Sequence, residues 1–156
     1  MLNNNFNYIN RLIAFGIFLL TFIVYFDTMA PTVSYWDCGE FIAVSHTLGV
    51  PHPPGSPFFL LLGRIFSMLP FNEDIAFRVI IISPLVSALA VMLLYLSIVK
   101  VVTHWRGKVN SLSDCLIVFG GGVAGALAFA FTDSHWFNAV EAEVYAFSTF
   151  FTAIVC

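Results

Sequence analysis

Long apolar runs that contain no charged residue constrain this chain more than any other feature of its sequence. Residues 79–99 contain no Asp, Glu, Lys or Arg, and neither do residues 12–26 or residues 115–132. A helix needs about 20 mostly apolar residues to cross a bilayer. These runs predict membrane spans at about 10–30, 76–100 and 114–132, with an incomplete fourth span at 141–156.

The composition excludes several classes of protein. Of the 156 residues, 60% are hydrophobic and 10% are charged, whereas soluble domains average roughly 45–50% apolar and about 25% charged residues. A soluble globule of this size could not bury so much apolar surface. The net charge of −3 gives no general attraction to nucleic acid, and the cysteines lie too far apart for a disulfide framework or a zinc spacing. We therefore predict an all-α, polytopic membrane protein whose first partner is the lipid bilayer.

Residues 144–156 are too short to complete a crossing. We therefore expect residues 1–156 to be the N-terminal part of a larger transmembrane domain. A secretory signal peptide over residues 1–30 is the alternative reading of the first span, but no A-x-A-like cleavage site follows the apolar run. We favour an uncleaved span.

The few charges sort by side. Basic residues precede the first predicted span and follow the second, namely Arg11, Lys100, Arg106 and Lys108. The positive-inside rule then makes the N-terminus and the 100–114 loop cytoplasmic. All the acidic residues except Asp114 fall on the opposite side, in the predicted outer loops or at the outer ends of the predicted spans.

The small residues of the third span predict close helix packing. Gly120, Ala124 and Ala128 recur every four positions, and such a stripe lets two helix backbones approach closely in lipid. The glycine-rich stretch 120–125 lacks the pattern of a phosphate-binding loop.

The predicted outer loop, residues 31–75, departs from a plain membrane protein. Residues 37–49 have the pattern of a short helix whose apolar side includes Phe41, Ile42, Val44, Ser45 and Leu48. The proline elbow, residues 51–55, then excludes a helix. Residues 57–69 resume as an apolar helix, too short to span, that contains Arg64. We expect two helices lying at the outer membrane surface, joined by the elbow.

Asp37 and Glu40 lie three residues apart, on one face of a helix start. Their spacing leaves two interpretations equally open. An Asp at the N-cap followed by a Glu three residues later resembles a capping box. A carboxylate sheltered by Tyr35, Trp36 and Phe41 would instead have a raised pKa and could act as a general base.

Two histidines and two arginines are further candidates in the outer loop. His46 and His52 could bind a phosphate when protonated or hydrogen-bond a substrate hydroxyl. The structural alternative is that His52 packs between prolines and that His46 caps its helix. Arg64 and Arg78 would either anchor helices at the lipid boundary, the commoner case, or clamp a lipid-linked phosphate.

A second polar segment, residues 133–143, follows the third predicted span. Glu141 and Glu143 are two residues apart, so on a helix they would point in different directions. We expect one of them to face inward near the membrane, where a carboxylate is costly and therefore indicates function.

Three segments together resemble a known family. Residues 35–41 read YWDCGEF, residues 49–57 read GVPHPPGSP, and residues 141–145 read EAEVY. These segments resemble the DUF2723 family, which includes the TMEM260-like protein O-mannosyltransferases and many bacterial membrane proteins. That family is similar to the GT-C glycosyltransferases, which are polytopic enzymes that use a polyprenyl-phosphate sugar and keep an acidic base in the first outer loop.

The resemblance implies a role for each candidate residue. Asp37 falls where the base belongs and would take the proton from an acceptor hydroxyl, with inversion at the sugar carbon. Glu40 would orient the acceptor or share the role of base. His52 and Arg64 would lie near the donor phosphate, and Glu141 or Glu143 would complete the pocket.

The implied activity is transfer of a sugar, with mannose as the expected one, from a polyprenyl-phosphate donor to a protein or glycan hydroxyl at the outer or lumenal face. The implied location is a bacterial inner membrane, and residues 1–156 alone are expected to be inactive. No cofactor is identified and no metal ligand is assigned, although the pattern leaves a divalent metal open. A membrane transporter and a noncatalytic assembly subunit are the alternative functions.

Overall fold

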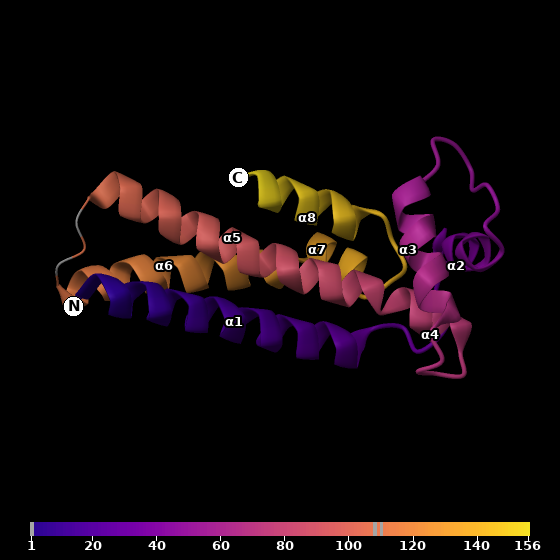
Figure 1. The fold of residues 1–156 in the computed structure, drawn as a ribbon, viewed down its shortest axis with the longest axis horizontal. Coiled ribbons are helices and arrows are strands. Elements are labelled where there is room, and N and C mark those ends of the chain that lie inside the picture. The colour runs from indigo at the N-terminus through magenta and orange to yellow at the C-terminus, as the bar shows by residue number, and fades with distance from the viewer. Residues whose placement is uncertain (1, 108, 110) are drawn as a thin grey trace.

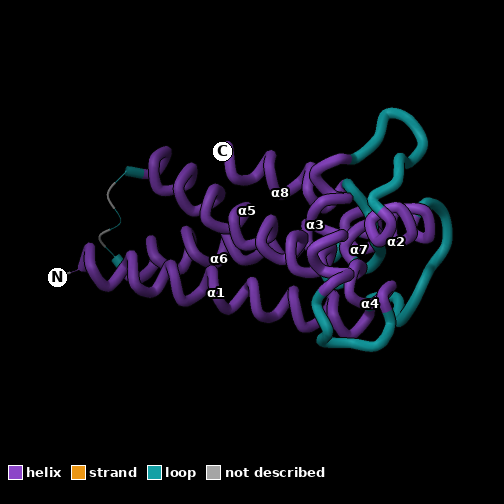
Figure 2. Tube along the Cα trace, turned by 45° about the vertical axis from the view of Figure 1, so that its right-hand side comes forward, coloured by secondary structure: helices purple, strands orange, loops and turns teal. Residues whose placement is uncertain are grey.

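The computed structural model describes residues 2–107, 109 and 111–156, with side chains from residue 5 onward. Within these residues the chain forms helices and loops and no strand, which confirms the predicted all-α fold (Figure 2). The helices are α1 (Leu2–Thr28), α2 (Cys38–Thr47), α3 (Pro57–Met68), α4 (Ile75–Ile80), α5 (Ile82–Arg106), α6 (Leu112–Ala130), α7 (Asp133–Ala139) and α8 (Tyr145–Val155).

Three stretches are long and apolar enough to cross a membrane. They are Asn5–Thr28 in α1, Ile75–Arg106 across α4 and α5, and Leu112–Ala130 in α6. The long helices lie side by side in an elongated bundle, in which α5 contacts α1, α6 and α8 (Figure 1). They coincide with the three predicted spans and make the chain a multi-pass membrane protein. The fourth predicted span begins as the shorter apolar helix α8.

The predicted 100–114 loop is shorter than expected. Because α5 continues through Arg106 and α6 begins at residue 112, only residues 107–111 connect the two helices. Arg106 lies in the last turn of α5, where a positive charge interacts favourably with the helix dipole, and Lys108 lies outside the described residues. Asp114, the acidic exception on this side, forms a capping box at the start of α6 and pairs with Arg106 at 2.7 Å.

The small residues of α6 pack against α5, but on a different face from the predicted one. The buried small residues are Gly122, Ala126 and Ala130. The predicted stripe of Gly120, Ala124 and Ala128 is exposed in this chain. The four-residue period is right and its register is wrong by two positions, because a period alone does not say which face of a helix meets a neighbour.

Helices α2, α3 and α4 form an end lobe, residues 38–80, at the end of the bundle away from the N-terminus (Figure 1). Helices α2 and α3 match the two predicted helices, and the proline elbow between them contains no helix. Leu48 was expected on the apolar side of α2 but lies beyond its end and is exposed. Helix α4 falls at the start of the predicted span 76–100 and was not predicted as a separate helix. It begins at Asp74, whose carboxylate accepts a hydrogen bond of 2.8 Å from the Ala76 backbone.

The two arginines of the end lobe satisfy carbonyl groups at helix ends. Arg64 donates a hydrogen bond to the carbonyl of His46 in the last turn of α2. Arg78 donates to the carbonyls of Ser67 at 2.7 Å and Leu69 at 3.1 Å, at the end of α3. The last carbonyls of a helix have no partner within it, so both arginines have a structural role inside the lobe.

A linker of residues 140–144 joins α7 to α8, and the backbone N–H of Ala30 ties it to the end of α1 by donating to the Val140 carbonyl at 3.1 Å. Glu141 and Glu143 lie in this linker and not on a helix. The expectation that they point in different directions because they are two residues apart on a helix therefore does not apply to them.

Candidate active site

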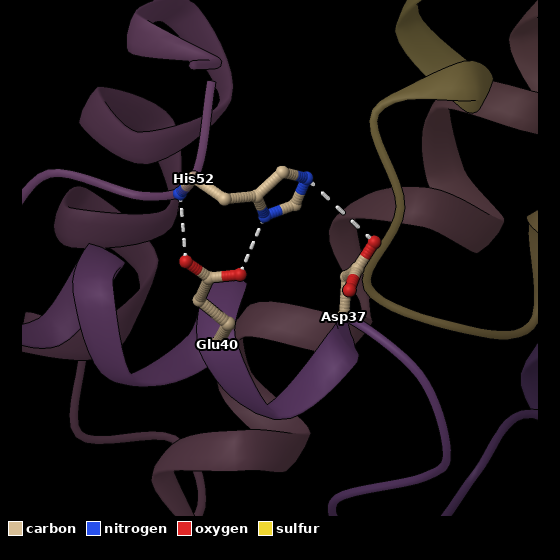
Figure 3. A group of neighbouring side chains, drawn as sticks. All are labelled: Asp37, Glu40 and His52. Atoms are coloured by element: carbon tan, nitrogen blue, oxygen red, sulfur yellow. Dashed lines mark hydrogen bonds and ion pairs between the residues drawn. The ribbon is translucent and has the colours of Figure 1, made fainter. Parts of the chain in front are cut away.

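Asp37, Glu40 and His52 come together on the outside of the end lobe (Figure 3). Glu40 accepts two hydrogen bonds from one residue: its Oε1 from the backbone N–H of His52 at 2.8 Å, and its Oε2 from the His52 ring Nδ1 at 2.6 Å. The other ring nitrogen, Nε2, lies 3.9 Å from Asp37 Oδ2. The imidazole thus stands between the two carboxylates.

Local backbone geometry produces this arrangement. Asp37 precedes the first residue of α2 and Glu40 lies in its first turn, so both carboxylates are at the same end of the helix. Leu48 adopts a left-handed conformation with φ of 54°, which ends α2 and turns the chain back. The proline elbow then runs beside α2 and places His52 next to Glu40, twelve residues earlier in the sequence.

The capping interpretation of Asp37 and Glu40 is wrong. Asp37 occupies the N-cap position, but its side chain accepts no hydrogen bond from the helix backbone. Glu40 binds His52 instead of reaching back to the N-cap. His52 likewise does not simply pack between prolines.

The expected apolar shelter around Asp37 is also wrong in part. Tyr35 and Trp36 are 83% and 84% exposed, and only Phe41 is buried. The Asp37 side chain itself is 55% exposed. It is therefore open to a ligand that approaches from outside the lobe.

The pKa values of the pair follow from their hydrogen bonds. The bonds that His52 donates, first from its ring and then from its backbone, lower the pKa of Glu40. The hydrogen bond to Glu40, followed by the attraction of its charge, raises the pKa of His52, and Asp37 adds to that attraction. Each group therefore favours the charged form of the other.

Glu143 joins this cluster through the linker before α8, which passes beside Asp37 (Figure 3). Burial is the main cause that raises the pKa of Glu143, and the negative charges of Asp37 and Glu141 add to it. The backbone N–H of Glu143 lies 3.4 Å from the Ser83 hydroxyl oxygen, which can accept a hydrogen bond from it. Glu141 is 7% exposed, and its Oε2 has no hydrogen-bond partner.

The structure separates Arg64 and His46 from this cluster. His46 lies in the last turn of α2, nine residues from Asp37, which corresponds to about 13 Å along a helix. Arg64 lies in α3 and donates to the His46 carbonyl at that end of α2. The remaining sequence candidates, Asp37, Glu40, His52 and Glu143, share one site. Ser83 also contributes to the site, and its one signal in the sequence is its place next to Pro84 near the outer end of an apolar run.

The same three side chains have the composition of a cation site. One ligand atom from each of Asp37, Glu40 and His52 can lie within 4.8 Å of the others. Two carboxylates and an imidazole are suitable ligands for divalent metals such as Mn²⁺ or Zn²⁺. A metal here would have to compete with the hydrogen bond between Glu40 and His52, which satisfies both groups without it.

Comparisons with known proteins agree with the resemblance seen in the sequence. The family model described as the protein O-mannosyl-transferase TMEM260 N-terminal domain matches residues 37–156. The chain is 32% identical over 142 residues to the protein O-mannosyl-transferase tmem260 of Dictyostelium discoideum, covering 89% of this chain and 16% of that protein. It is 29% identical over 141 residues to the TMEM260 protein of Mus musculus, covering 90% of this chain and 18% of that protein. No solved structure matches.

The chain thus spans less than a fifth of the length of these relatives. The family match begins at Asp37, the first residue of the cluster, and includes both outer segments that contribute to it. Because the match covers most of the chain, the chain belongs to the family of TMEM260 N-terminal domains.

Proposed function

We propose that the whole protein is a glycosyltransferase that moves mannose from a polyprenyl-phosphate donor to a protein hydroxyl. The relatives named above are protein O-mannosyl-transferases, which favours a protein acceptor over a glycan. The observation that carries the proposal is the exposed carboxylate of Asp37, which accepts no hydrogen bond from the backbone of its own helix. It lies 3.9 Å from the ring of His52, whose raised pKa favours the protonated imidazole.

In the proposed reaction, Asp37 accepts the proton of the acceptor hydroxyl. The hydroxyl oxygen forms a bond to the anomeric carbon of the sugar while the bond from that carbon to the phosphate oxygen breaks. The phosphate leaves with the electron pair, and attack from the opposite side inverts the carbon. A general base of this kind contributes roughly 10²–10⁴-fold to a rate.

The other members of the cluster set the charges around Asp37 and provide a hydrogen-bond donor for the phosphate. His52 is charged most readily beside Glu40, and its Nε2 faces Asp37 and can also donate to a phosphate oxygen. Glu40 is then a positioning residue that acts through His52. Glu143 is close enough to Asp37 for their charges to influence each other, and Glu141 is buried in the same linker. The guanidinium of Arg64, in α3, donates to the His46 carbonyl at the far end of α2, so the geometry gives no support to its predicted role at the phosphate.

The location of the site relative to the membrane is part of the proposal. The end lobe lies at the end of the bundle opposite the first turns of α1 and the C-terminal end of α5 (Figure 1). With the basic residues on the cytoplasmic side, the cluster is on the outer or lumenal face. Both relatives come from eukaryotes, so they give no support to a bacterial inner membrane.

Replacing Asp37 tests the proposal. In the full-length protein, supplied with a polyprenyl-phosphate mannose and an acceptor peptide, we expect Asp37→Asn to lower sugar transfer by about 10²-fold or more. Glu73→Gln removes an exposed carboxylate of the same lobe that lies outside the cluster, and it should transfer at the normal rate. Normal transfer by Asp37→Asn would remove Asp37 from the reaction and favour a noncatalytic subunit.

No observation favours a transporter. Such a protein needs charged or broken helices at mid-membrane. In the described chain α5 is continuous from Ile82 to Arg106, and its charged residues lie in its last seven positions, from Lys100 onward.

A further inference from the structure

Apart from the cluster around Asp37, a cavity of about 280 Å³ lies between the end of α6, helix α7 and the first turns of α8. Six of its lining residues carry neutral polar side chains: Thr132, Ser134, His135, Asn138, Ser148 and Thr149. Phe129 and Tyr145 complete the lining, and no lining residue carries a formal charge at neutral pH apart from any proton on His135. The volume is just below the roughly 300–1,000 Å³ of pockets for drug-sized ligands, so it suits a small ligand or one unit of a larger one.

His135 supplies an acceptor that lacks a partner. It is only 7% exposed, and its ring nitrogen Nε2 has no hydrogen-bond partner. The ring also interacts with the backbone of Ser87, but burial is the larger influence and lowers the pKa of the imidazole. The ring is therefore neutral at pH 7. Since a bond to the Ser87 carbonyl needs the ring N–H, we assign the proton to Nδ1 and the free lone pair to Nε2.

Other polar groups of the cavity also present acceptors. The hydroxyl of Thr149 donates to the Tyr145 carbonyl at 3.0 Å, and the hydroxyl of Thr132 donates to the Phe129 carbonyl at 2.8 Å. The Asn138 amide donates to the Ser134 carbonyl at 2.7 Å. Because both threonine hydroxyl protons and one of the two Asn138 amide protons are engaged by the backbone, the oxygen lone pairs and the second Asn138 N–H remain for a ligand.

This arrangement selects a ligand by its chemistry. An anion such as a phosphate would meet no cation in the lining, and a metal ion would meet no carboxylate. An apolar chain would leave the buried Nε2 unpaired, which is unfavourable. A neutral ligand with several hydroxyl donors satisfies the acceptors, and its apolar ring face can lie on Phe129, whose ring centroid is 4.4 Å from that of His135.

We propose that this cavity binds a neutral sugar unit, with His135 Nε2 accepting a hydrogen bond from one sugar hydroxyl and Thr149 from another. The inference rests on the proposed function and names a carbohydrate subsite for it. The geometry connects the two places: α8 begins directly after the linker that carries Glu143. Ser148 also lines a neighbouring cavity with Gly55 and Phe58, which follow His52 in the chain.

Binding of a simple sugar to the full-length protein in detergent tests this. The probe is methyl α-mannoside, detected by saturation-transfer NMR and titrated to a dissociation constant. His135→Phe keeps a ring in place and removes the free nitrogen, and we expect it to weaken binding at least about fivefold, as for one lost hydrogen bond. Thr149→Val removes one hydroxyl and should weaken binding by a similar factor.

Thr152→Val is the matched control. Thr152 lies on the same helix and its hydroxyl also bonds a carbonyl four residues back, at 2.8 Å. It lines the adjacent apolar cavity, which shares Phe129, Ser148 and Thr149 with the subsite, and it does not line the subsite itself. It should bind methyl α-mannoside as the unchanged protein does. Folding of each variant is checked by its circular dichroism and its elution from a sizing column, and Thr149→Val is decisive if His135→Phe does not fold.

The outcomes separate this subsite from the catalytic proposal. Asp37→Asn should retain methyl α-mannoside binding even when it abolishes transfer, and failure of transfer assays alone leaves the subsite result unchanged. The subsite is overturned if the unchanged protein does not bind the sugar, if His135→Phe and Thr149→Val bind normally, or if Thr152→Val loses as much. Binding of a Ser/Thr-rich peptide in place of the sugar, with the same dependence on His135, would also overturn the assignment.

Discussion

The helical bundle and the end lobe use their polar groups in opposite ways. In the bundle, Tyr25 is fully buried and its hydroxyl donates to the Ala130 carbonyl at 2.8 Å. In the end lobe, Glu40 and His52 pair with each other while their side chains remain 35% and 48% exposed. Lipid offers no hydrogen bonds, so a polar group inside a bundle is stabilised by an internal partner, which the Tyr25 hydroxyl has and the buried Tyr95 hydroxyl lacks. At the water-facing end the charges remain available to a substrate, which is why we place the chemistry there.

The largest difference in stability between the two regions is expected when a charge is introduced into each of them. Val91 is fully buried in α5 and Val50 is 92% exposed beside the proline elbow. We expect Val91→Asp to destabilise the protein by about 3 kcal/mol or more, because an unpaired carboxylate in the middle of a span is costly. Val50→Asp should change the stability by less than about 0.5 kcal/mol. The yield of folded protein in detergent and its thermal unfolding measure both, and equal effects would contradict the assigned bundle.

The next largest change in stability is expected where two helices pack closely, and the closest such packing is between α2 and α3 in the end lobe. A Cβ on Gly63 of α3 would lie 2.8 Å from the Cβ of Ser45 in α2, and a Cβ that close to a backbone cannot easily be relieved. The Ser45 Cβ is a side-chain atom, but it is fixed to its own backbone and cannot be moved away by rotating a side-chain bond. We therefore expect Gly63→Ala to destabilise the protein by about 1–3 kcal/mol. Ser45→Gly in the same chain should restore most of the loss, as read from thermal unfolding of the single and double variants.

The bundle supplies a comparison for Gly63. A Cβ on Gly122 would lie 2.8 Å from the end of the Val99 side chain and 2.9 Å from the Tyr95 ring, which can shift more readily than a backbone. Gly122→Ala should therefore cost less than Gly63→Ala. Gly121, around which nothing lies within 4 Å, should accept Ala without loss. A larger loss at Gly121 than at Gly122 would mean that α6 meets α5 by another face.

Two tyrosines test what a hydrogen bond contributes inside the bundle. Tyr25 and Tyr95 are both fully buried, but only the Tyr25 hydroxyl has a partner, the carbonyl of Ala130. We expect Tyr25→Phe to cost about 0.5–1.5 kcal/mol of stability. Tyr95→Phe removes an unpaired buried hydroxyl and should be neutral or stabilising. Thermal unfolding measures both, and an equal loss at the two positions would show that burial of the ring alone decides the effect.

The difference between the bundle and the end lobe also explains which features could be predicted from the sequence. Spans follow from hydropathy because lipid imposes one requirement along a whole helix, and the helices over 79–99 and 115–132 appear where their apolar runs predict them. Register does not follow in the same way. The face of α6 that meets α5 depends on how the side chains of both helices fit together, and the predicted stripe at Gly120 was on the wrong side.

In the end lobe the candidate residues could be predicted and their partners could not. Asp37, Glu40 and His52 stand out because charges and histidines are few in this chain. Their spacing favoured a cap as much as a catalytic pair, because a capping box and a ligand site use the same residues. The decisive fact, that Glu40 turns to His52 across the elbow, depends on a chain reversal of twelve residues that no local pattern specifies.

The smallest expected effect on stability, and the most informative about the site, concerns pH. The pKa of His52 is raised by its hydrogen bond to Glu40, so the stability that this contact contributes is present below the ordinary histidine pKa of 6.5 and is lost as the pH rises through the raised value. The pKa of Glu40 is lowered, so its contribution is present above 4.5 and is lost as the pH falls through the lowered value. The contact is therefore strongest between pH 4.5 and pH 6.5, the two ordinary pKa values.

An NMR titration of the His52 ring should show a raised midpoint. Glu40→Gln should return that midpoint towards 6.5. His52→Gln is the matched control for the lobe, because it removes the titrating ring and keeps a neutral polar side chain at that position. If Glu40→Gln left the midpoint unchanged, the pair would not hold the charge on His52, and Glu40 would have no positioning role beside Asp37.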